Sequence, residues 1–278
     1  MASEILLNQN LTPEMRKTLF EDAELDMLWH CQADPRFPYY ARLPANTYDP
    51  DRGVLRTAVL VHGTGGHAQH YLEAFRAFAD RNGIALIAPL FPGGLIERED
   101  FSSYKMLSCQ GVRYDLVLLA MLDELGRRFE RLDTGRVFMF GHSGGGQFTH
   151  RFLYAHPERL AAAAVGAPGR ITYLDDGHDY FWGTRDFEDY FDKRPDIGKI
   201  RQVPVQLLIG EHDTKDIGPS PFGSSRMERL LNLKKNYEDK GIDVRIKIVP
   251  GAGHSDGYRE RSLAAMDFFE KVLAGTAQ

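Results

Sequence analysis

The sequence is poor in the features that mark several classes of protein. Its 278 residues include only two cysteines, Cys31 and Cys109, which excludes a framework of several disulfides. No apolar run approaches the roughly 18 residues needed to cross a membrane, so no membrane partner is expected. The stretch MASEILLNQNLTPEM lacks the basic region and the long apolar run of a secretion signal. We therefore expect a reduced, cytoplasmic protein.

The chain also lacks a large excess of either positive or negative charge. The formal net charge is −5 and no run of Lys and Arg stands out, so nucleic acid is not an expected partner. With 43% hydrophobic and 26% charged residues, and without repeats, the composition is ordinary for a globular protein that buries a sizeable core. We predict a single domain over residues 1–278, and the composition leaves open whether it forms a homo-oligomer.

Apolar runs alternate with amphipathic segments from residue 57 onward. The continuous apolar runs, typical of strands in a sheet covered on both faces, lie at 57–62, 84–90, 136–140, 161–167, 203–210 and 244–250. Helical spacing of apolar residues occurs at 70–81, 113–131, 146–155, 225–240 and 258–273. Gly241, just after the range 225–240, fits a C-cap. This alternation predicts an α/β fold with a mostly parallel sheet, preceded by an antiparallel pair at 25–32 and 37–45. Ligands bind such sheets beyond the carboxyl ends of the strands.

Residues 168–202 interrupt this alternation. They contain Tyr180, Phe181 and Trp182 among further aromatic residues, interleaved with Asp and Glu. A long insertion within a domain is usually functional or disordered, and so many aromatic side chains argue against disorder. We predict a small cap over the active edge of the sheet, in which Tyr180, Phe181 and Trp182 bind an apolar or aromatic part of the substrate. The alternative is a surface excursion whose aromatic side chains fill its own small core.

The stretch GHSGG follows the apolar run RVFMF and precedes a helical pattern. Gly141, Ser143 and Gly145 satisfy the pattern G-x-S-x-G, in which a strand turns at once into a helix. Such a turn strains the backbone of the serine, leaves no room for side chains at the flanking positions and exposes the hydroxyl above the sheet. We therefore predict that Ser143 is a nucleophile rather than part of an ordinary glycine-rich loop.

A serine nucleophile needs a general base and a carboxylate that orients the base. His254 lies in the stretch GAGHSDG, after the last apolar run and before the last helix. Asp213 follows the run VPVQLLIG and is far enough beyond the strand end to reach across to His254, with Glu211 as the alternative acid. The residues thus occur in the order nucleophile, acid and base, which predicts a catalytic triad.

The stretch VHGTGGHA allows two other interpretations. Gly63, Gly65 and Ala68 satisfy the dinucleotide pattern G-x-G-x-x-A, but the next strand ends in IAPLFPGG and offers no acid to hold a ribose. His62, His67 and His70 invite a metal site, yet no carboxylate or cysteine completes a ligand set at the required spacing. We predict neither a cofactor nor a metal, and Cys109 as a buried or half-buried thiol.

The motifs HGTGG, GHSGG, GEHDT and GAGHSDG together resemble those of the α/β-hydrolase superfamily, in its serine esterase (carboxylesterase-like) branch, over nearly the whole chain. The resemblance implies that the backbone N–H groups of Thr64 and Gly144 form the oxyanion hole. A serine at the nucleophile position argues against the dehalogenase and epoxide-hydrolase branches, which use aspartate there.

We expect hydrolysis of a small carboxylic ester through an acyl-enzyme. Two alternatives use the same triad: a polyester depolymerase, against which the missing secretion signal counts, and a peptidase or amidase. For the latter, the chain is too short for the large gating domain of the prolyl-oligopeptidase type. A non-catalytic binding protein on a hydrolase fold is a further alternative, although such proteins typically lose a member of the triad.

Overall fold

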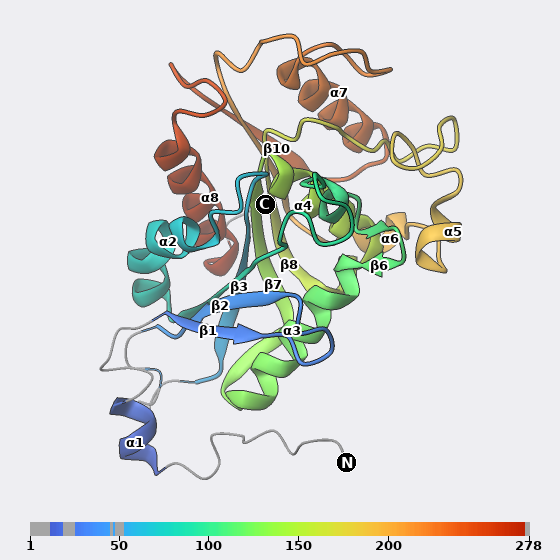
Figure 1. Cartoon of the computed structure of the whole chain (residues 1–278). Helices are drawn as coiled ribbons and strands as arrows, with labels where there is room; N and C mark the ends of the chain where they lie inside the picture. Colours follow the sequence, from blue (N-terminus) through green and yellow to red (C-terminus); the bar gives the residue numbers. More distant parts are fainter. Residues whose placement is uncertain (1–11, 19–25, 45–46, 48–52, 276–278) are drawn as a thin grey trace.

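The structure is a computed structural model that describes residues 12–18, 26–44, 47 and 53–275 (Figure 1). Within these residues an eight-stranded sheet has the order β1-β2-β4-β3-β7-β8-β9-β10, and β5 and β6 form a separate two-stranded sheet. The strands are β1 (Met27–His30), β2 (Pro38–Arg42), β3 (Leu55–Val61), β4 (Ile84–Pro89), β5 (Ser108–Cys109), β6 (Val112–Arg113), β7 (Leu132–His142), β8 (Leu160–Gly166), β9 (Val205–Gly210) and β10 (Val244–Val249). Neighbouring strands from β4 to β10 are parallel, whereas β2 is antiparallel to both β1 and β4.

Helices cover both faces of the large sheet (Figure 1). On one face lie α2 (Ala68–Asn82) and α8 (Tyr258–Leu273); on the other lie α3 (Tyr114–Arg128), α4 (Gly144–Ala155) and α7 (Arg226–Asp239). The shorter elements are α1 (Pro13–Lys17), η3 (Ser103–Met106), η4 (Pro157–Arg159), α5 (Phe187–Phe191) and α6 (Ile197–Ile200). Among the described helices, none combines the length and the apolar character that a membrane crossing requires.

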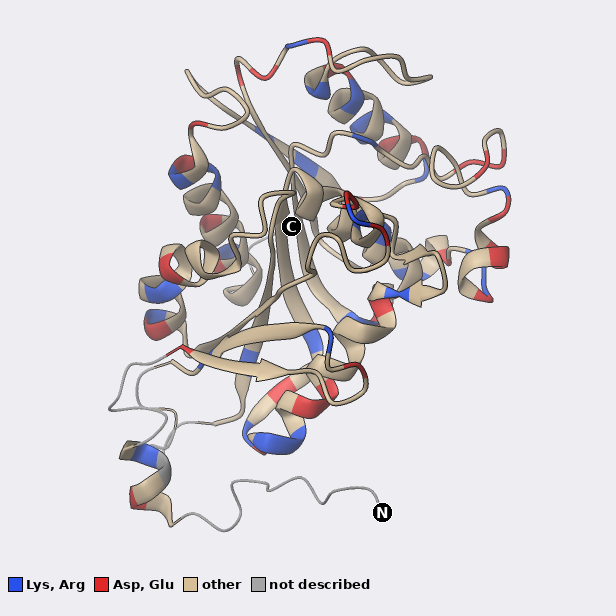
Figure 2. Cartoon of the chain, in the orientation of Figure 1, with Lys and Arg blue, Asp and Glu red and all other residues tan. Residues whose placement is uncertain are grey.

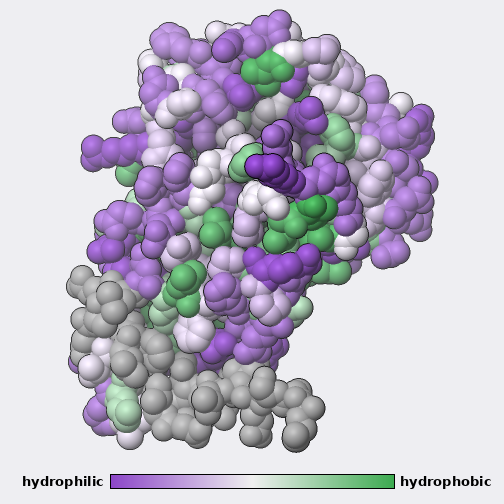
Figure 3. Space-filling view, viewed as in Figure 1, coloured by the Kyte–Doolittle hydropathy of each residue, from purple (hydrophilic) through white to green (hydrophobic). Residues whose placement is uncertain are grey.

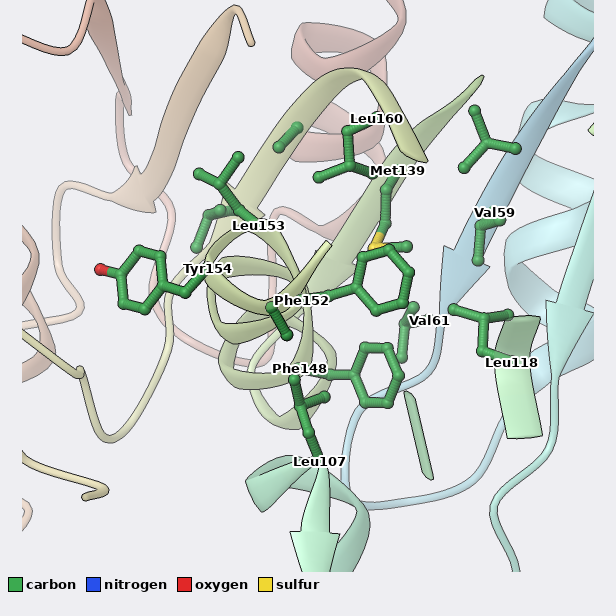
Figure 4. Close-up of a cluster of buried hydrophobic side chains, with 14 of the residues drawn as sticks. Val59, Val61, Leu107, Leu118, Met139, Phe148, Phe152, Leu153, Tyr154 and Leu160 are labelled. Atoms are coloured by element: carbon green, nitrogen blue, oxygen red, sulfur yellow. The ribbon is translucent and has the colours of Figure 1, made fainter. Parts of the chain in front are cut away.

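The apolar strands feed two separate cores because successive side chains of a strand point to opposite faces. Val59, Val61 and Met139 pack with Phe148 and Phe152 of α4 on one face (Figure 4). The intervening residues of the same strands pack against α2 and α8 on the other face. Each such buried side chain contributes roughly 1.5–3 kcal/mol, so the sheet centre is a rigid support for the loops at its edge. The outer surfaces, by contrast, carry Lys and Arg interspersed with Asp and Glu and are mostly hydrophilic in the view shown (Figures 2 and 3).

The predicted secondary structure is confirmed in kind and differs at its boundaries. All six apolar runs are strands, but β7 begins at Leu132, before the predicted start at 136. The helix after Ser143 begins at Gly144 rather than at 146. Gly241 follows Lys240, the C-cap residue of α7, and its φ of +68° is typical of the glycine that ends a helix. The antiparallel pair is formed by β1 and β2, and residues 25 and 45 of the predicted pair lie outside the described residues.

Residues 168–202 connect β8 to β9 and carry the two short helices α5 and α6. In Figure 1 these helices lie at the edge of the molecule, on the side of α3 and β6. Aromatic side chains pack together here: the ring centroids of Phe187 and Phe191 are 4.2 Å apart, and Tyr180 contacts both rings edge to face. The segment therefore has an apolar centre of its own.

Candidate active site

The order of the strands places one pair of loops at the point where the sheet changes direction. From β3 the chain passes to β4 on one side, and β7 then lies on the other side of β3. Val61 at the end of β3 is in register with Gly141 at the end of β7. The loops that follow β3 and β7 therefore start side by side at a topological switch point, where ligands bind in open α/β sheets.

Ser143 occupies the turn between β7 and α4. Its backbone has φ of 57° and ψ of −110°, a region that residues with a side chain rarely adopt. Two hydrogen bonds hold the turn: the Ser143 N–H donates to Gly166 O at 2.8 Å, and Ser143 O accepts from the Gln147 N–H at 3.1 Å. This is the strained strand-to-helix turn expected of the G-x-S-x-G pattern.

The glycines after Ser143 allow α4 to approach the sheet closely. A Cβ atom on Gly145 would overlap the carbonyl group of Val61 in β3, and one on Gly146 would overlap the carbonyl oxygen of Gly166 in β8. The start of α4 thus lies directly on the backbones of two strands, which fixes the position of the Ser143 hydroxyl.

Three side chains that are far apart in the sequence form a continuous chain of hydrogen bonds. His254 Nδ1 lies 2.7 Å from Asp213 Oδ2, and His254 Nε2 lies 3.1 Å from Ser143 Oγ. Because an ionised carboxylate can only accept, Nδ1 carries the proton and the Nε2 lone pair faces the serine hydroxyl. Glu211, the alternative acid, is exposed and instead accepts the N–H of Gly251 at 2.8 Å. The structure therefore brings Asp213, and not Glu211, to His254.

Asp213 has a second partner on the side away from His254. Its Oδ1 atom accepts a hydrogen bond from Arg226 Nη1 of α7 at 3.2 Å, and the residue is only 2% exposed. Burial acts to raise the pKa of Asp213, but the hydrogen bond from His254 and the positive charges nearby outweigh it and hold the pKa below its ordinary value. The carboxylate is therefore charged at neutral pH, as it must be to stabilise a protonated imidazole.

Backbone N–H groups lie beside Ser143 at the start of α4. Gly144 is the first residue of α4, so its N–H has no acceptor within the helix and lies at the positive end of the helix dipole. A Cβ atom on Gly144 would be 3.2 Å from Thr64 N, and one on Gly63 would be 3.8 Å from Ser143 Cβ. The structure thus brings Thr64 and Gly144 together next to Ser143.

Two residues that the sequence reasoning missed hold the loop of His254. Arg261, which is 1% exposed, donates to the carbonyl oxygens of Gly253 at 2.7 Å, His254 at 2.8 Å and Asp256 at 2.6 Å. His142 Nε2 lies 3.2 Å from the carbonyl oxygen of His254. Burial, followed by the positive charges of Arg261 and His254, lowers the pKa of His142 to about 3. His142 could have been noticed because it lies inside GHSGG, whereas no motif marks Arg261.

Two cavities of similar volume lie near the start of α4, and Ser143 lines the first of them. The first cavity has a volume of about 490 Å³, and we name it the histidine–tyrosine cavity. Ser143 and His254 line it together with His67, His70, Tyr71 and Tyr258. The second cavity has a volume of about 440 Å³, and we name it the basic cavity. Its lining includes Gln147, Phe181 and four basic side chains: Lys105, Arg170, Arg226 and Arg229. A larger cavity of about 600 Å³ lies at the opposite, amino-terminal ends of the strands, away from Ser143.

The aromatic residues predicted to bind substrate have three different environments. Tyr180 is buried, and its hydroxyl donates to Met106 O at 2.5 Å, so it belongs to the core of residues 168–202 and lines neither cavity beside Ser143. Trp182 packs edge to face on Phe222 and also lines neither cavity. Phe181 alone lines the basic cavity. Tyr180 instead fills the core of its own segment, and Trp182 packs on Phe222, which lies outside residues 168–202.

The remaining sequence candidates do not belong to the hydrogen-bond chain of Ser143, His254 and Asp213. Within the residues that the structure describes, Cys31 is buried, Cys109 is half-buried and both thiols are free. The rings of His67 and His70 are stacked with centroids 5.0 Å apart. Over the same residues, no group of three or more His, Cys, Asp or Glu side chains is placed to hold a metal ion. His62 instead accepts the N–H of Phe91 at 3.0 Å and supports the loop after β3.

Sequence comparison finds relatives for part of the chain. Residues 114–276, more than half of the chain, match the sequence model of the prolyl oligopeptidase family. Feruloyl esterase B from Neurospora crassa is 28% identical over 134 residues, which cover 43% of this chain and 41% of the esterase. The chain therefore matches less than half of the length of that relative.

Structural comparison covers nearly all of the chain. LpqC, a poly(3-hydroxybutyrate) depolymerase from Bordetella parapertussis, has a TM-score of 0.69 and 21% identity, over 94% of this chain and 94% of that one. Poly(aspartic acid) hydrolase-1 from Sphingomonas sp. KT-1 has a TM-score of 0.68 and 19% identity, over 87% of this chain and 97% of that one. These likenesses concern the fold, and they confirm the predicted α/β-hydrolase architecture.

Proposed function

The chain belongs to the prolyl oligopeptidase family, within the α/β-hydrolase superfamily, and we propose that it is a serine esterase that forms an acyl-enzyme at Ser143. The observation that carries the proposal is the hydrogen-bond chain from Ser143 Oγ through His254 to Asp213 Oδ2, with distances of 3.1 and 2.7 Å. The substrate class is a small carboxylic ester.

In the acylation step, the proton of Ser143 moves along the hydrogen-bond chain to His254, which Asp213 stabilises. Ser143 Oγ attacks the ester carbonyl carbon while His254 Nε2 accepts the hydroxyl proton. The carbonyl oxygen becomes an oxyanion, to which the N–H groups of Thr64 and Gly144 donate. The protonated His254, stabilised by Asp213, then gives its proton to the leaving alcohol as the C–O bond breaks.

Deacylation repeats these steps with water. His254 Nε2 removes a proton from water, and the hydroxide attacks the acyl carbon through a second oxyanion at the same N–H groups. The bond to Ser143 Oγ breaks, Oγ regains the proton from His254, and the carboxylic acid leaves. No other group is required, since the ester and water together supply all the atoms of the alcohol and the acid.

Amide hydrolysis is the second candidate, because the family match favours it. An amine is a poorer leaving group than an alcohol, so cleavage depends more strongly on protonation of the leaving atom by His254. The same triad and oxyanion donors serve both reactions. The identity of the scissile bond is therefore a question for a substrate panel.

The test is a panel of 4-nitrophenyl esters, aryl esters, a polyester film and aminoacyl amides, run against the wild type and Ser143→Ala. We expect ester turnover by the wild type and a loss of about 10⁶-fold in kcat for Ser143→Ala, by analogy with other serine nucleophiles. A serine-directed phosphonate should label the wild type and not the variant. If the wild type is neither labelled nor active on any ester, the proposal fails; faster cleavage of amides than of esters selects the second candidate.

A further inference from the structure

The basic cavity has an excess of positive charge at a short distance from Ser143. Of the side chains that line it, Lys105, Arg170, Arg226 and Arg229 are basic and Asp100 is acidic. The four basic residues come from three separate segments. Lys105 lies in η3, Arg170 lies in the loop after β8, and Arg226 and Arg229 are three residues apart on one face of α7. The Asp100 carboxylate is occupied, because its Oδ1 atom accepts the N–H groups of Ser102 at 2.8 Å and Ser103 at 3.0 Å.

The arginines of α7 are not neutralised within the cavity. Arg226 pairs with Asp213, a carboxylate that is already shared with His254, and the buried Nε atom of Arg226 has no hydrogen-bond partner among the described residues. Arg229 donates to the carbonyl oxygens of Gly169, Gly218 and Gly223, which satisfy its N–H groups without cancelling its charge. Arg229 therefore adds to the positive potential of the cavity, whereas Asp213 partly offsets the charge of Arg226.

The same holds for the cations on the other wall. Lys105 Nζ donates to the neutral hydroxyl of Ser102 at 3.0 Å, and the guanidinium of Arg170 lies over the ring of Phe181, 5.2 Å from its centroid. Burial, followed by the positive charge of Arg170, lowers the pKa of Lys105 to about 8. A bound anion would reverse the second of these effects, because it favours the charged form of Lys105.

A buried arginine behind this wall strengthens the field. Arg151 of α4 is fully buried and donates to Thr172 Oγ1 at 2.9 Å and to Lys105 O at 2.6 Å. In the described part of the chain no carboxylate pairs with it, and its Nη2 atom has no hydrogen-bond partner. A charge so far from water is weakly screened, so its potential reaches the cavity.

The position of the basic cavity relative to His254 assigns it to the acyl part of the substrate. The leaving alcohol must lie within hydrogen-bond reach of His254 Nε2, on the side of the histidine–tyrosine cavity, which His254 itself lines. The basic cavity instead contains Gln147, one turn after Ser143 on α4, and Lys105, whose Cε atom would be 2.9 Å from a Cβ atom on Gly144. The acyl chain of a substrate attached to Ser143 can extend in that direction.

From these contacts we propose that the basic cavity binds a carboxylate at the far end of the acyl chain, so that the preferred substrates are monoesters of dicarboxylic acids. The inference rests on the proposed esterase function and adds the charge of the substrate to it. The distal carboxylate takes no part in bond making or breaking. Its attraction to Arg170 and Lys105 places the ester carbonyl at Ser143.

The kinetic test compares 4-nitrophenyl hemiglutarate with neutral 4-nitrophenyl valerate, after subtraction of the spontaneous rates. We expect the wild type to favour the hemiglutarate in kcat/KM, and Arg170→Glu to lower the ratio of the two values by at least tenfold. Arg185→Glu is the matched control: Arg185 is an exposed arginine of the same segment, undergoes the same change of charge and does not line the basic cavity. Its ratio should equal that of the wild type.

A binding measurement separates failure of this inference from failure of the proposed function. Glutarate should raise the unfolding midpoint of Ser143→Ala, and it should no longer do so when Arg170→Glu is added. If the wild type cleaves both esters and the ratio is the same in Arg170→Glu and Arg185→Glu, the inference is overturned and the esterase function stands. If neither ester is cleaved but glutarate binding depends on Arg170, the function fails and the anion site stands.

Discussion

The two cavities near the start of α4 differ in the charge of their linings, and none of the residues that line one also lines the other. The histidine–tyrosine cavity is lined by His67, His70, Tyr71 and Tyr258, and its floor carries Ser143 and His254. The basic cavity is lined by four cationic side chains and one carboxylate. Asp213 lies between them, since Oδ2 contacts His254 on one side and Oδ1 contacts Arg226 on the other.

Under the proposed function, this difference separates catalysis from substrate recognition. A general base must be neutral before it accepts a proton, and nearby cations would oppose the positive charge it then acquires. Asp213 places an anion between His254 and the four cations of the basic cavity, whereas Arg261, the cation that lines the histidine–tyrosine cavity, donates to carbonyl oxygens of the His254 loop. The following predictions each remove one element of this separation.

The largest effect is expected for Asp213→Asn, which removes the negative charge that contacts both His254 and Arg226. The amide cannot stabilise the protonated His254 and favours the wrong tautomer, so kcat/KM should fall about 10⁴-fold for neutral and anionic esters alike. Glu211→Gln is the control, because Glu211 contacts the Gly251 N–H and not His254. A loss below tenfold in Asp213→Asn, or an equal loss in both variants, would contradict the assigned role.

A smaller effect is expected for Gly144→Ala, at the boundary of the two cavities. The added methyl group would overlap the hydroxyl of Tyr104 and approach Thr64 N to 3.2 Å, displacing an oxyanion donor. Loss of one donor lowers kcat by about 10²–10³-fold. Gly53→Ala, whose Cβ would meet no atom within 4 Å, should be unaffected. Adding Tyr104→Phe to Gly144→Ala should restore part of kcat; unchanged kcat in Gly144→Ala would remove Gly144 from the site.

The smallest effect concerns stability in acid and tests whether His142 stays neutral under the histidine–tyrosine cavity. The pKa of His142 is about 3 in the folded protein, against about 6.5 for an unfolded chain. Between these values the unfolded state binds more protons, so the free energy of unfolding falls as pH falls. His142→Gln should remove about 2 kcal/mol of the loss between pH 7 and pH 5, measured by denaturant unfolding. Equal pH slopes in the wild type and the variant would show that His142 is not held neutral.

Local patterns in the sequence were sufficient for the fold and for the turn that carries Ser143. The apolar runs predicted β3, β4, β7, β8, β9 and β10 because a strand covered on both faces needs apolar side chains, whereas no run predicted the short strands β5 and β6. GHSGG predicted the strained turn at Ser143 because only glycine fits where α4 lies on the strands. These features depend on neighbouring residues, so they can be read from the chain directly.

The failures have the opposite origin. Tyr180 and Trp182 were assigned to the substrate because they are aromatic, but Tyr180 packs in the core of the insertion and Trp182 packs on Phe222 of a later segment. No local pattern in the sequence marks Arg226 or Arg261. Arg226 contacts Asp213 in the loop before its helix, and Arg261 contacts the carbonyl oxygen of His254, seven residues earlier in the chain. Their roles follow from which surfaces meet, which a pattern of neighbours does not contain.

The sequence by itself determined the sheet, the turn at Ser143 and the chain order of Ser143, Asp213 and His254. Only the tertiary structure decided that Asp213 rather than Glu211 meets His254, and that Lys105, Arg170, Arg226 and Arg229 converge on one cavity. The reason is physical. Backbone conformation and burial depend on residues close in the sequence, whereas electrostatic potential depends on distance in space and adds the charges of segments from residue 100 to residue 229.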